Sequence, residues 1–302
     1  MAPEARLRRP WLEIARALPW LAPSLLLIGL VVLYPAAELV RASLGRYSIT
    51  GLYQQFVGLG NYVRLLEQDA LPGVVANTVV WVVAVVGPTL LISLGLAQLV
   101  NARFPGRRLV RLALIVPWAA SLIMTSKLFA WIYDYYFGIL NRVLVATGIL
   151  RAPVDWLGDD ATVMPSMVAV GIFVSLPFTT YTLLAGLQAI PDNVYEAARV
   201  DGASGPRTYW SVTLPLLEPA IAVAAVLNVI YVFNSFPIVW TLNDRNPGFA
   251  HDTMITYMYK VAFKSAQRDV GLAAAVGVVN VALILLAVLA YLRVARSAED
   301  EP

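Results

Sequence analysis

The chain has 302 residues, of which 59% are hydrophobic and only 14% are charged, and its mean hydropathy is +0.71. A soluble domain carries about 25% charged residues, so this composition excludes an ordinary soluble protein and indicates several membrane spans. The net charge of +3 comes mainly from arginines at the edges of apolar stretches, without a basic stripe interleaved with aromatics, and predicts no nucleic-acid partner. The absence of cysteine excludes disulfides. The single histidine, His251, is expected to be a solvated loop residue and excludes a multi-histidine metal site.

Six stretches are long and apolar enough to cross a membrane, which takes about 20 residues each. A backbone in lipid must satisfy its own hydrogen bonds, and runs of this length lack the alternation of barrel strands, so each is predicted to be a helix. The predicted fold class is therefore all-α, a polytopic membrane protein with six transmembrane helices. The stretches are 20–40, 74–100, 112–133, 163–187, 216–240 and 272–292.

Arginines in short segments predict the orientation of these spans, because positive charge is retained on the cytoplasmic side. One cluster lies in the N-terminal tail and the other follows the second stretch, without acidic residues beside the second: Arg6, Arg8, Arg9 and Arg16, then Arg103, Arg107, Arg108 and Arg111. With six spans, both termini and residues 190–213 are then cytoplasmic. The predicted division is a basic tail over 1–18, a six-helix domain over 19–293 and a cytoplasmic tail over 294–302.

A mostly polar segment, residues 190–221, separates the fourth and fifth apolar stretches. Asp192 or Asn193 is expected to cap a short helix, and Glu196 lies three residues after Asn193, the spacing of a capping box. Gly202 follows an aspartate and predicts the turn that ends this helix. The segment therefore reads as a short helical hairpin.

The same segment resembles the EAA loop of binding-protein-dependent ABC importer permeases. It reads Glu-Ala-Ala, three residues, glycine, nine residues and then Val-x-Leu-Pro, where the family usually has isoleucine in place of Val212. In that family the loop docks onto the ATPase subunit, so the resemblance implies that residues 190–215 couple this chain to ATP hydrolysis. The alternative is an ordinary cytoplasmic hairpin in which Glu196 only interacts with the helix dipole. The implied coupling residues are Tyr195, Glu196, Ala197, Ala198, Asp201, Gly202, Ala203, Leu214 and Pro215.

Residues 56–62, between the first and second stretches, read FVGLGNY. On physical grounds they predict only a turn-rich segment followed by a short amphipathic helix. They also resemble the F-x-G-L-x-N-Y signature of the carbohydrate branch of these permeases. The loop 242–250 departs from that branch, because it keeps Pro247 and lacks the paired glycines before it. Its contact with a binding protein is left open.

Polar and aromatic side chains recur at helical spacing in the fourth and fifth stretches. Such uncharged faces suit a sugar, since hydroxyls pair with amides and hydroxyls while the apolar CH faces rest on aromatic rings. These faces resemble, by position, those that line the solute site of maltose-type permeases. The alternative is interhelical contact, where buried polar groups find partners on other helices. The implied pathway residues are Gly171, Ser175, Phe178, Asn228, Tyr231 and Ser235.

Lys127 is the one lysine well inside a predicted span. An intramembrane lysine is a candidate functional residue. The alternative is that its amine reaches the membrane surface or pairs with Asp134.

The resemblance implies a permease subunit of an ATP-driven importer for a mono- or oligosaccharide, in the cytoplasmic membrane of a bacterium or archaeon. It implies as partners a second permease subunit, two ATPase subunits, an extracytoplasmic substrate-binding protein and the lipid bilayer. The chain has no G-x-x-x-x-G-K-[ST] phosphate loop, so it is not predicted to be an enzyme or to bind a cofactor. ATP and Mg²⁺ are assigned to the ATPase subunits.

Other solutes remain open within the same class: glycerol phosphate, an amino acid or another small molecule. If the solute is glycerol phosphate, Lys127 would be the positive group that attracts its phosphate. An ion-coupled secondary transporter would require carboxylates inside the spans. The stretches hold only Glu38 and Glu218, both near span ends, which argues against that class.

Overall fold

The computed structural model describes residues 10–244, 248–265 and 268–299. The regular elements of the described chain are helices except for one short β-hairpin, so the predicted all-α class is confirmed with that one addition. It divides into two units, residues 1–66 with 261–278 and residues 67–260 with 279–302. Arg6, Arg8 and Arg9 of the basic tail, Pro247 of the loop 242–250 and the last three residues lie outside the described ranges.

Four helices are individually long and apolar enough to cross a membrane, and two bent helix pairs each pass the same test together. Counting each pair as one span gives six, the predicted number. The four are Leu18–Ser43, Leu71–Asn101, Asp160–Ala189 and Val270–Leu289; the pairs are Arg107–Ala119 with Leu122–Ile132, bent by 99°, and Gly205–Leu216 with Glu218–Phe233, bent by 63°.

The prediction of one continuous helix over 112–133 is wrong. The chain forms α5 (Arg107–Ala119) and α6 (Leu122–Ile132), separated by Ala120 and Ser121, which have extended ψ angles of 145° and 137°. Pro117 lies in the last turn of α5, where it cannot donate a backbone hydrogen bond and so weakens the helix before the break.

The prediction of one helix over 216–240 is also wrong. Helix α12 (Glu218–Phe233) ends at Asn234, and α13 (Phe236–Leu242) begins after Ser235, whose φ and ψ are −75° and 74°. Pro237 cannot donate to the carbonyl of Phe233, so an uninterrupted helix would lack a hydrogen bond at this point. The fifth apolar stretch is therefore two helices with a break between them.

Both predicted tails are partly helical. Helix α1 (Pro10–Ile28) begins inside the predicted tail 1–18. At the other end, α15 (Val270–Glu299) continues beyond the predicted span 272–292 and through most of the predicted tail 294–302.

The first unit contains α1, a π-helical turn over Gly29–Leu33, α2 (Tyr34–Ser43), the strands β1 (Gly45–Tyr47) and β2 (Tyr53–Phe56), and α3 (Gly60–Leu66). The two strands pair antiparallel, with Gly45 opposite Phe56. The sequence predicts only turns and a short helix in the segment between the first and second stretches, so the two strands are a correction. They are too short, at three and four residues, to give a clear alternating pattern in the sequence.

Asn61, from the F-x-G-L-x-N-Y segment, holds this unit together. Its amide nitrogen donates to the carbonyl oxygens of Ser43 and Gly45 at 2.9 and 2.8 Å, and its oxygen accepts from Arg64 at 3.3 Å. A side chain on Gly271 of α15 would collide with the Gly45 carbonyl and with the Asn61 amide. The segment thus fixes α3 against the end of α2 and the start of α15.

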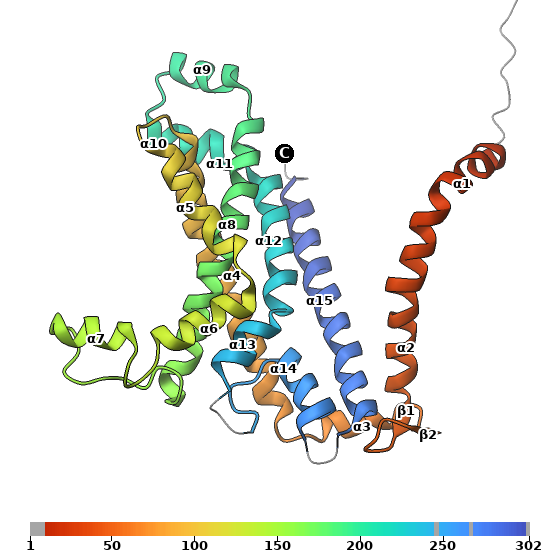
Figure 1. Ribbon diagram of the computed structural model, residues 1–302. Helices are drawn as coiled ribbons and strands as arrows, with labels where there is room; N and C mark the ends of the chain where they lie inside the picture. The colour runs from red at the N-terminus through yellow and green to blue at the C-terminus, as the bar shows by residue number, and fades with distance from the viewer. Residues whose placement is uncertain (1–9, 245–247, 266–267, 300–302) are drawn as a thin grey trace, which may run out of the picture. The chain divides into compact units, whose positions relative to one another are not determined.

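The second unit is built on three helices that pack side by side, α4 (Leu71–Asn101), α8 (Asp160–Ala189) and α12 (Figure 1). The indole nitrogen of Trp81 on α4 donates to the carbonyl of Val232 on α12 at 2.9 Å. Two hydrophobic clusters form the core at different levels of α8, one around Met167 and Val170 and the other around Leu183 and Leu187.

Shorter elements complete the second unit. They are α7 (Ile139–Ala146), α9 (Asp192–Val200), α10 (Gly205–Thr208), a π-helical turn over Tyr209–Thr213, α11 (Leu214–Leu216) and α14 (Met254–Tyr259). A third π-helical turn, Lys260–Lys264, follows α14, and from Val261 on it belongs to the first unit. Helices α7 and α9 lie beyond opposite ends of α8 (Figure 1).

Candidate functional site

A cavity of about 300 Å³ opens between α5, α8 and α12. It lies on α8 between the two core clusters, because Val174 belongs to the first cluster and the second begins at Leu183. Three aromatic rings contribute to its wall, and no charged side chain does. Its lining residues are Trp118, Val174, Ser175, Phe178, Leu227, Asn228 and Tyr231.

Two buried polar side chains of this wall have unused hydrogen-bonding capacity. The Asn228 amide nitrogen donates to the Thr179 hydroxyl at 2.9 Å, and that hydroxyl donates to the Ser175 carbonyl at 2.9 Å. Within the described chain, the Asn228 amide oxygen and the Ser175 hydroxyl oxygen have no hydrogen-bond partner. Buried polar atoms without partners are uncommon in folded proteins and require an explanation such as a ligand or a water. The wall can therefore both accept and donate hydrogen bonds.

The structure brings together four of the six predicted pathway residues: Ser175, Phe178, Asn228 and Tyr231. Gly171 does not line the cavity. A Cβ at this position would lie 2.8 Å from Trp81 and 2.8 Å from Val85, so Gly171 allows α4 and α8 to pack closely.

Ser235 does not line the cavity either. It lies in the break between α12 and α13, where the helical spacing from Asn228 no longer applies, and its hydroxyl is buried without a partner in the described chain. Trp118 lines the cavity without having been predicted, although an aromatic residue directly after Pro117 in an apolar run is a recognisable signal.

The predicted hairpin is present, and α9 forms its first arm. The start of α9 differs from the prediction: the capping position is Pro191, and neither Asp192 nor Asn193 provides a side-chain cap. Pro191 has the extended backbone that a helix start requires, with φ and ψ of −65° and 142°, so the backbone sets the start without a capping box.

The end of α9 agrees with the prediction. Asp201 is the C-terminal capping residue and Gly202 adopts a left-handed φ of +72°, which glycine tolerates without a steric cost. The backbone nitrogen of Ala203 donates to the carbonyl of Ala198 at 2.9 Å and closes the turn. Ala198 is buried, whereas Glu196 and Ala197 are exposed. The exposed face of α9 therefore carries the Glu196 carboxylate and the Ala197 methyl group, and Tyr195 is half-buried beside them.

The second arm leads into α12. Leu214 and Pro215 lie in α11, at the end of the segment Gly205–Leu216, and this segment meets α12 at a bend of 63°. Leu217 at the bend is 1% exposed and packs in the same cluster as Leu187, near the end of α8. Both arms of the hairpin are therefore anchored in one hydrophobic cluster.

Two large apolar side chains of the hairpin are exposed and were not predicted to take part in contacts. Val200 at the end of α9 is 88% exposed, and Trp210 in the π-helical turn is 66% exposed. Their exposure beside the predicted coupling residues gives the hairpin an apolar surface, which a sequence pattern alone could not locate.

Two other predictions concern charged or titratable residues. Lys127 is exposed on α6, on the described surface of this chain. His251 is not the solvated loop residue that was expected: its ring is 12% exposed and its Nε2 lies 2.8 Å from a carboxylate oxygen of Asp160. The expectation failed because the start of α8 comes close to the loop that carries His251, a contact between residues 91 positions apart.

A buried carboxylate anchors the loop that follows α13. Asp252 is 1% exposed; one of its oxygens accepts from the Asn243 amide at 3.0 Å and the other lies 2.8 Å from the Lys260 ammonium. The described residues contain no group of three or more histidine, cysteine, aspartate or glutamate side chains placed to hold a metal ion.

Comparison with known proteins gives one family and several relatives. The family described as "Binding-protein-dependent transport system inner membrane component" matches residues 89–299. The chain is 33% identical to the sulfoquinovosyl glycerol transport system permease protein SmoG of Agrobacterium fabrum, over 95% of this chain and 93% of that protein. It is 34% identical to the trehalose/maltose transport system permease protein MalF of Thermococcus litoralis, over 81% of each.

A solved structure has the same fold. It is a chain of a bacterial alginate ABC transporter in complex with an alginate pentasaccharide-bound periplasmic protein, with a TM-score of 0.82 and 22% identity, covering 97% of this chain and 99% of that chain.

Proposed function

The chain belongs to the family of binding-protein-dependent transport system inner membrane components, as an ABC importer permease, and we propose that the solute it carries is a carbohydrate. The observation that supports this solute class is the cavity between α5, α8 and α12. Its wall combines unpartnered polar atoms with aromatic rings and contains no charged side chain.

Each part of that wall matches a part of a sugar. In this proposal the Asn228 oxygen and the Ser175 hydroxyl, both buried without a partner in the described chain, bond sugar hydroxyls, and a hydrogen bond made there replaces one that the sugar loses to water. Phe178 and Tyr231, 39% and 41% exposed, present ring surface on which the CH face of a sugar packs. A cavity of about 300 Å³ is at the lower end of the range for ligand pockets.

The same wall argues against glycerol phosphate. A phosphate group in a water-poor site requires a positive partner or many donors. Lys127, the sequence-based candidate for that partner, is not among the residues that line the cavity. The names of the two relatives described above agree with a sugar, since one includes trehalose and maltose and the other a sulfoquinovosyl glycerol, whereas a further relative, 29% identical, is named as an sn-glycerol-3-phosphate permease.

The hairpin around α9 is proposed as the contact with the ATPase. In this proposal the exposed Glu196 pairs with a basic group of the ATPase, while Val200 and Trp210 become buried on docking. Tyr195, Ala197, Ala198, Asp201, Gly202 and Ala203 shape this surface, and Leu214 and Pro215 carry its movement into α12.

The proposed assembly contains this chain, a second permease subunit, two ATPase subunits and a substrate-binding protein outside the membrane. ATP and Mg²⁺ are bound by the ATPase subunits, and this chain contributes no cofactor site. Both of its termini are proposed to lie in the cytoplasm of a bacterium or archaeon.

The test is transport by the reconstituted assembly with its binding protein, using a panel of maltose, trehalose and glycerol 3-phosphate. We expect Tyr231→Ala to lower sugar uptake about tenfold at subsaturating concentration, since the lost ring contact is equivalent to about 1.4 kcal/mol. The measurement is the initial rate of labelled-solute uptake into proteoliposomes.

The matched control is Ile230→Ala, because Ile230 is the adjacent residue on α12, is 36% exposed and does not line the cavity. Equal losses in both variants would count against the cavity as the solute site. Uptake of glycerol 3-phosphate in preference to both sugars would overturn the proposed solute class.

A further inference from the structure

A second cavity, of about 610 Å³, lies at the turn between α4 and α5, away from the solute cavity. It is lined by Arg103, Phe104, Gly106, Arg107, Arg108 and Arg111. Four of these six residues carry a positive charge and none carries a negative charge. In the sequence, no aspartate or glutamate occurs between Asp69 and Asp134, so neighbouring positions supply no compensating charge.

The local backbone supports the binding of an anion. Gly106 occupies the position before α5 with a left-handed φ of +89°, and α5 has no side-chain cap at this end. The first turn of a helix presents backbone N–H groups and a partial positive charge, which adds to the charge of the arginines. Arg111 is held in place, because one of its terminal nitrogens donates to the Val100 carbonyl at 3.0 Å.

Arg111 also has a hydrogen-bond donor that is not used. Its Nε atom is buried and has no hydrogen-bond partner within the described chain. A buried guanidinium nitrogen without an acceptor costs free energy, and a bound phosphate oxygen would remove that cost.

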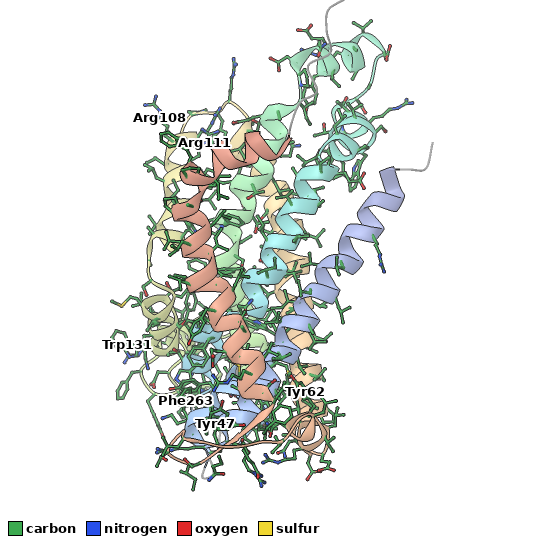
Figure 2. All side chains as sticks on the ribbon, turned by 90° about the vertical axis from the view of Figure 1, so that its right-hand side faces the viewer. Tyr47, Tyr62, Arg108, Arg111, Trp131 and Phe263 are labelled. Carbon is green, nitrogen blue, oxygen red and sulfur yellow. The ribbon has the colours of Figure 1, made fainter. Side chains whose placement is uncertain are left out.

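The cavity lies where the spans end. Helix α4 ends at Asn101, and the Tyr181 hydroxyl near the end of α8 donates to the Arg111 carbonyl at 2.9 Å. Figure 2 shows Arg108 and Arg111 at the end of the second unit at which α9 lies. Basic residues at the end of a membrane span are placed at the level of lipid headgroups.

One face of α5 continues from the cavity as an apolar surface. Leu112 and Ile115 follow Arg108 at helical spacings of four and seven, and they are 59% and 40% exposed. A free phosphate ion makes no favourable contact with such an apolar surface, whereas an acyl chain attached to the bound phosphate would cover it.

We propose that this arginine cavity binds the phosphate group of an anionic phospholipid, with an acyl chain lying along Leu112 and Ile115 of α5. This site is separate from solute transport and does not depend on which solute is carried. A phospholipid and free inorganic phosphate both carry a phosphate group, and the experiment distinguishes between these two ligands.

The experiment uses the full chain, purified in detergent and stripped of lipid. Phosphatidylglycerol and phosphatidylcholine are titrated separately, and bound lipid is counted by native mass spectrometry. We expect phosphatidylglycerol to bind at least about tenfold more tightly than phosphatidylcholine. The variant Arg103→Gln/Arg108→Gln should weaken phosphatidylglycerol binding roughly 30-fold, a factor of about five for each arginine.

Arg103 and Arg108 are exposed, so their replacement leaves the packing around Arg111 intact. The charge-matched control is Arg142→Gln/Arg151→Gln, two exposed arginines outside the cavity, and it should bind phosphatidylglycerol like the wild type. A second arm replaces the lipid by inorganic phosphate, with chloride at equal ionic strength as its control, and follows thermal stability.

Three outcomes overturn the proposal. Equal weakening in both double variants would indicate nonspecific attraction. Stabilisation by inorganic phosphate as large as that by phosphatidylglycerol would assign the cavity to a soluble anion. No preference among lipids, together with loss of copurifying partner subunits from the Arg103→Gln/Arg108→Gln variant, would assign it to a protein contact.

Discussion

Gly171 and Ser175 are one helical turn apart on α8 and serve different purposes. Ser175 lines the solute cavity, whereas Gly171 lies against Trp81 and Val85 of α4. Both of these α4 side chains are almost completely buried, and the Trp81 indole is also bonded to the Val232 carbonyl, so neither can move aside freely. The absence of a side chain at Gly171 therefore sets the separation of α4 and α8 next to the cavity wall.

At the residue scale we predict that Gly171→Ala destabilises the second unit. The added methyl group would lie 2.8 Å from two buried side chains, and overpacking of this kind typically costs about 1–3 kcal/mol. The measurement is the midpoint of thermal unfolding in detergent. Gly95→Ala on α4 is the control, because no neighbouring atom lies within 4 Å of a Cβ there. An unchanged midpoint for Gly171→Ala, or an equal drop for Gly95→Ala, would contradict the packing role.

At the element scale, the break in a helix explains one misplaced site residue, Ser235, whereas Gly171 lies on a continuous helix and still does not line the cavity. Helix α8 is uninterrupted from Asp160 to Ala189, so the spacing of Ser175 and Phe178 correctly placed both on one face. The fifth stretch breaks after Phe233, so the same reasoning failed for Ser235. An apolar run has the same hydropathy whether its helix is straight or broken. The number and order of spans could therefore be predicted, while breaks of two residues could not.

The hairpin that carries α9 is attached to packed helices on both sides. Leu187 near the end of α8 and Leu217 at the start of α12 share one hydrophobic cluster. Gly186 of α8 lies against Ala220 of α12, where a side chain would collide. A displacement of α9 therefore acts on α8 and α12 together, and these helices supply most of the solute-cavity wall.

At this scale we predict that Gly202→Val uncouples the hairpin. A β-branched residue is strongly disfavoured at a φ of +72°, whereas asparagine tolerates it, so Gly202→Asn should keep the turn. We expect Gly202→Val to lower solute-stimulated ATPase activity of the reconstituted assembly about tenfold, a cost of about 1–2 kcal/mol in the turn. Basal ATPase activity and membrane insertion should not change.

The control for position is Gly205→Ala, since Gly205 has no positive φ and no atom within 4 Å of a built Cβ. Stimulation as in the wild type for Gly202→Val, or a loss shared by all three variants, would remove the turn from the coupling mechanism.

At the scale of the whole molecule, the sequence located the hairpin better than the solute cavity. The hairpin is one continuous segment with its own turn residues, so its pattern could be recognised along the chain. The cavity requires Trp118, Ser175 and Asn228 to meet, and these residues come from three helices that are far apart in sequence. Which apolar helices pack together, and at what height, is determined by side-chain fit such as that at Gly171. This packing cannot be predicted from the hydropathy of the sequence.

The length of α8 makes the orientation of the chain in the membrane testable. Its 30 residues span about 45 Å, more than the roughly 30 Å hydrocarbon layer, so its two ends lie on opposite sides of a membrane. Ala152 lies before the first end and Ser204 after the second, and both are exposed. Since the chain has no cysteine, single variants Ala152→Cys and Ser204→Cys can be labelled without background. We expect a membrane-impermeant maleimide to label Ala152→Cys in intact cells and Ser204→Cys only after permeabilisation. The cysteine-free wild type is the control, and the reverse labelling pattern would place α9 out of reach of any cytoplasmic ATPase.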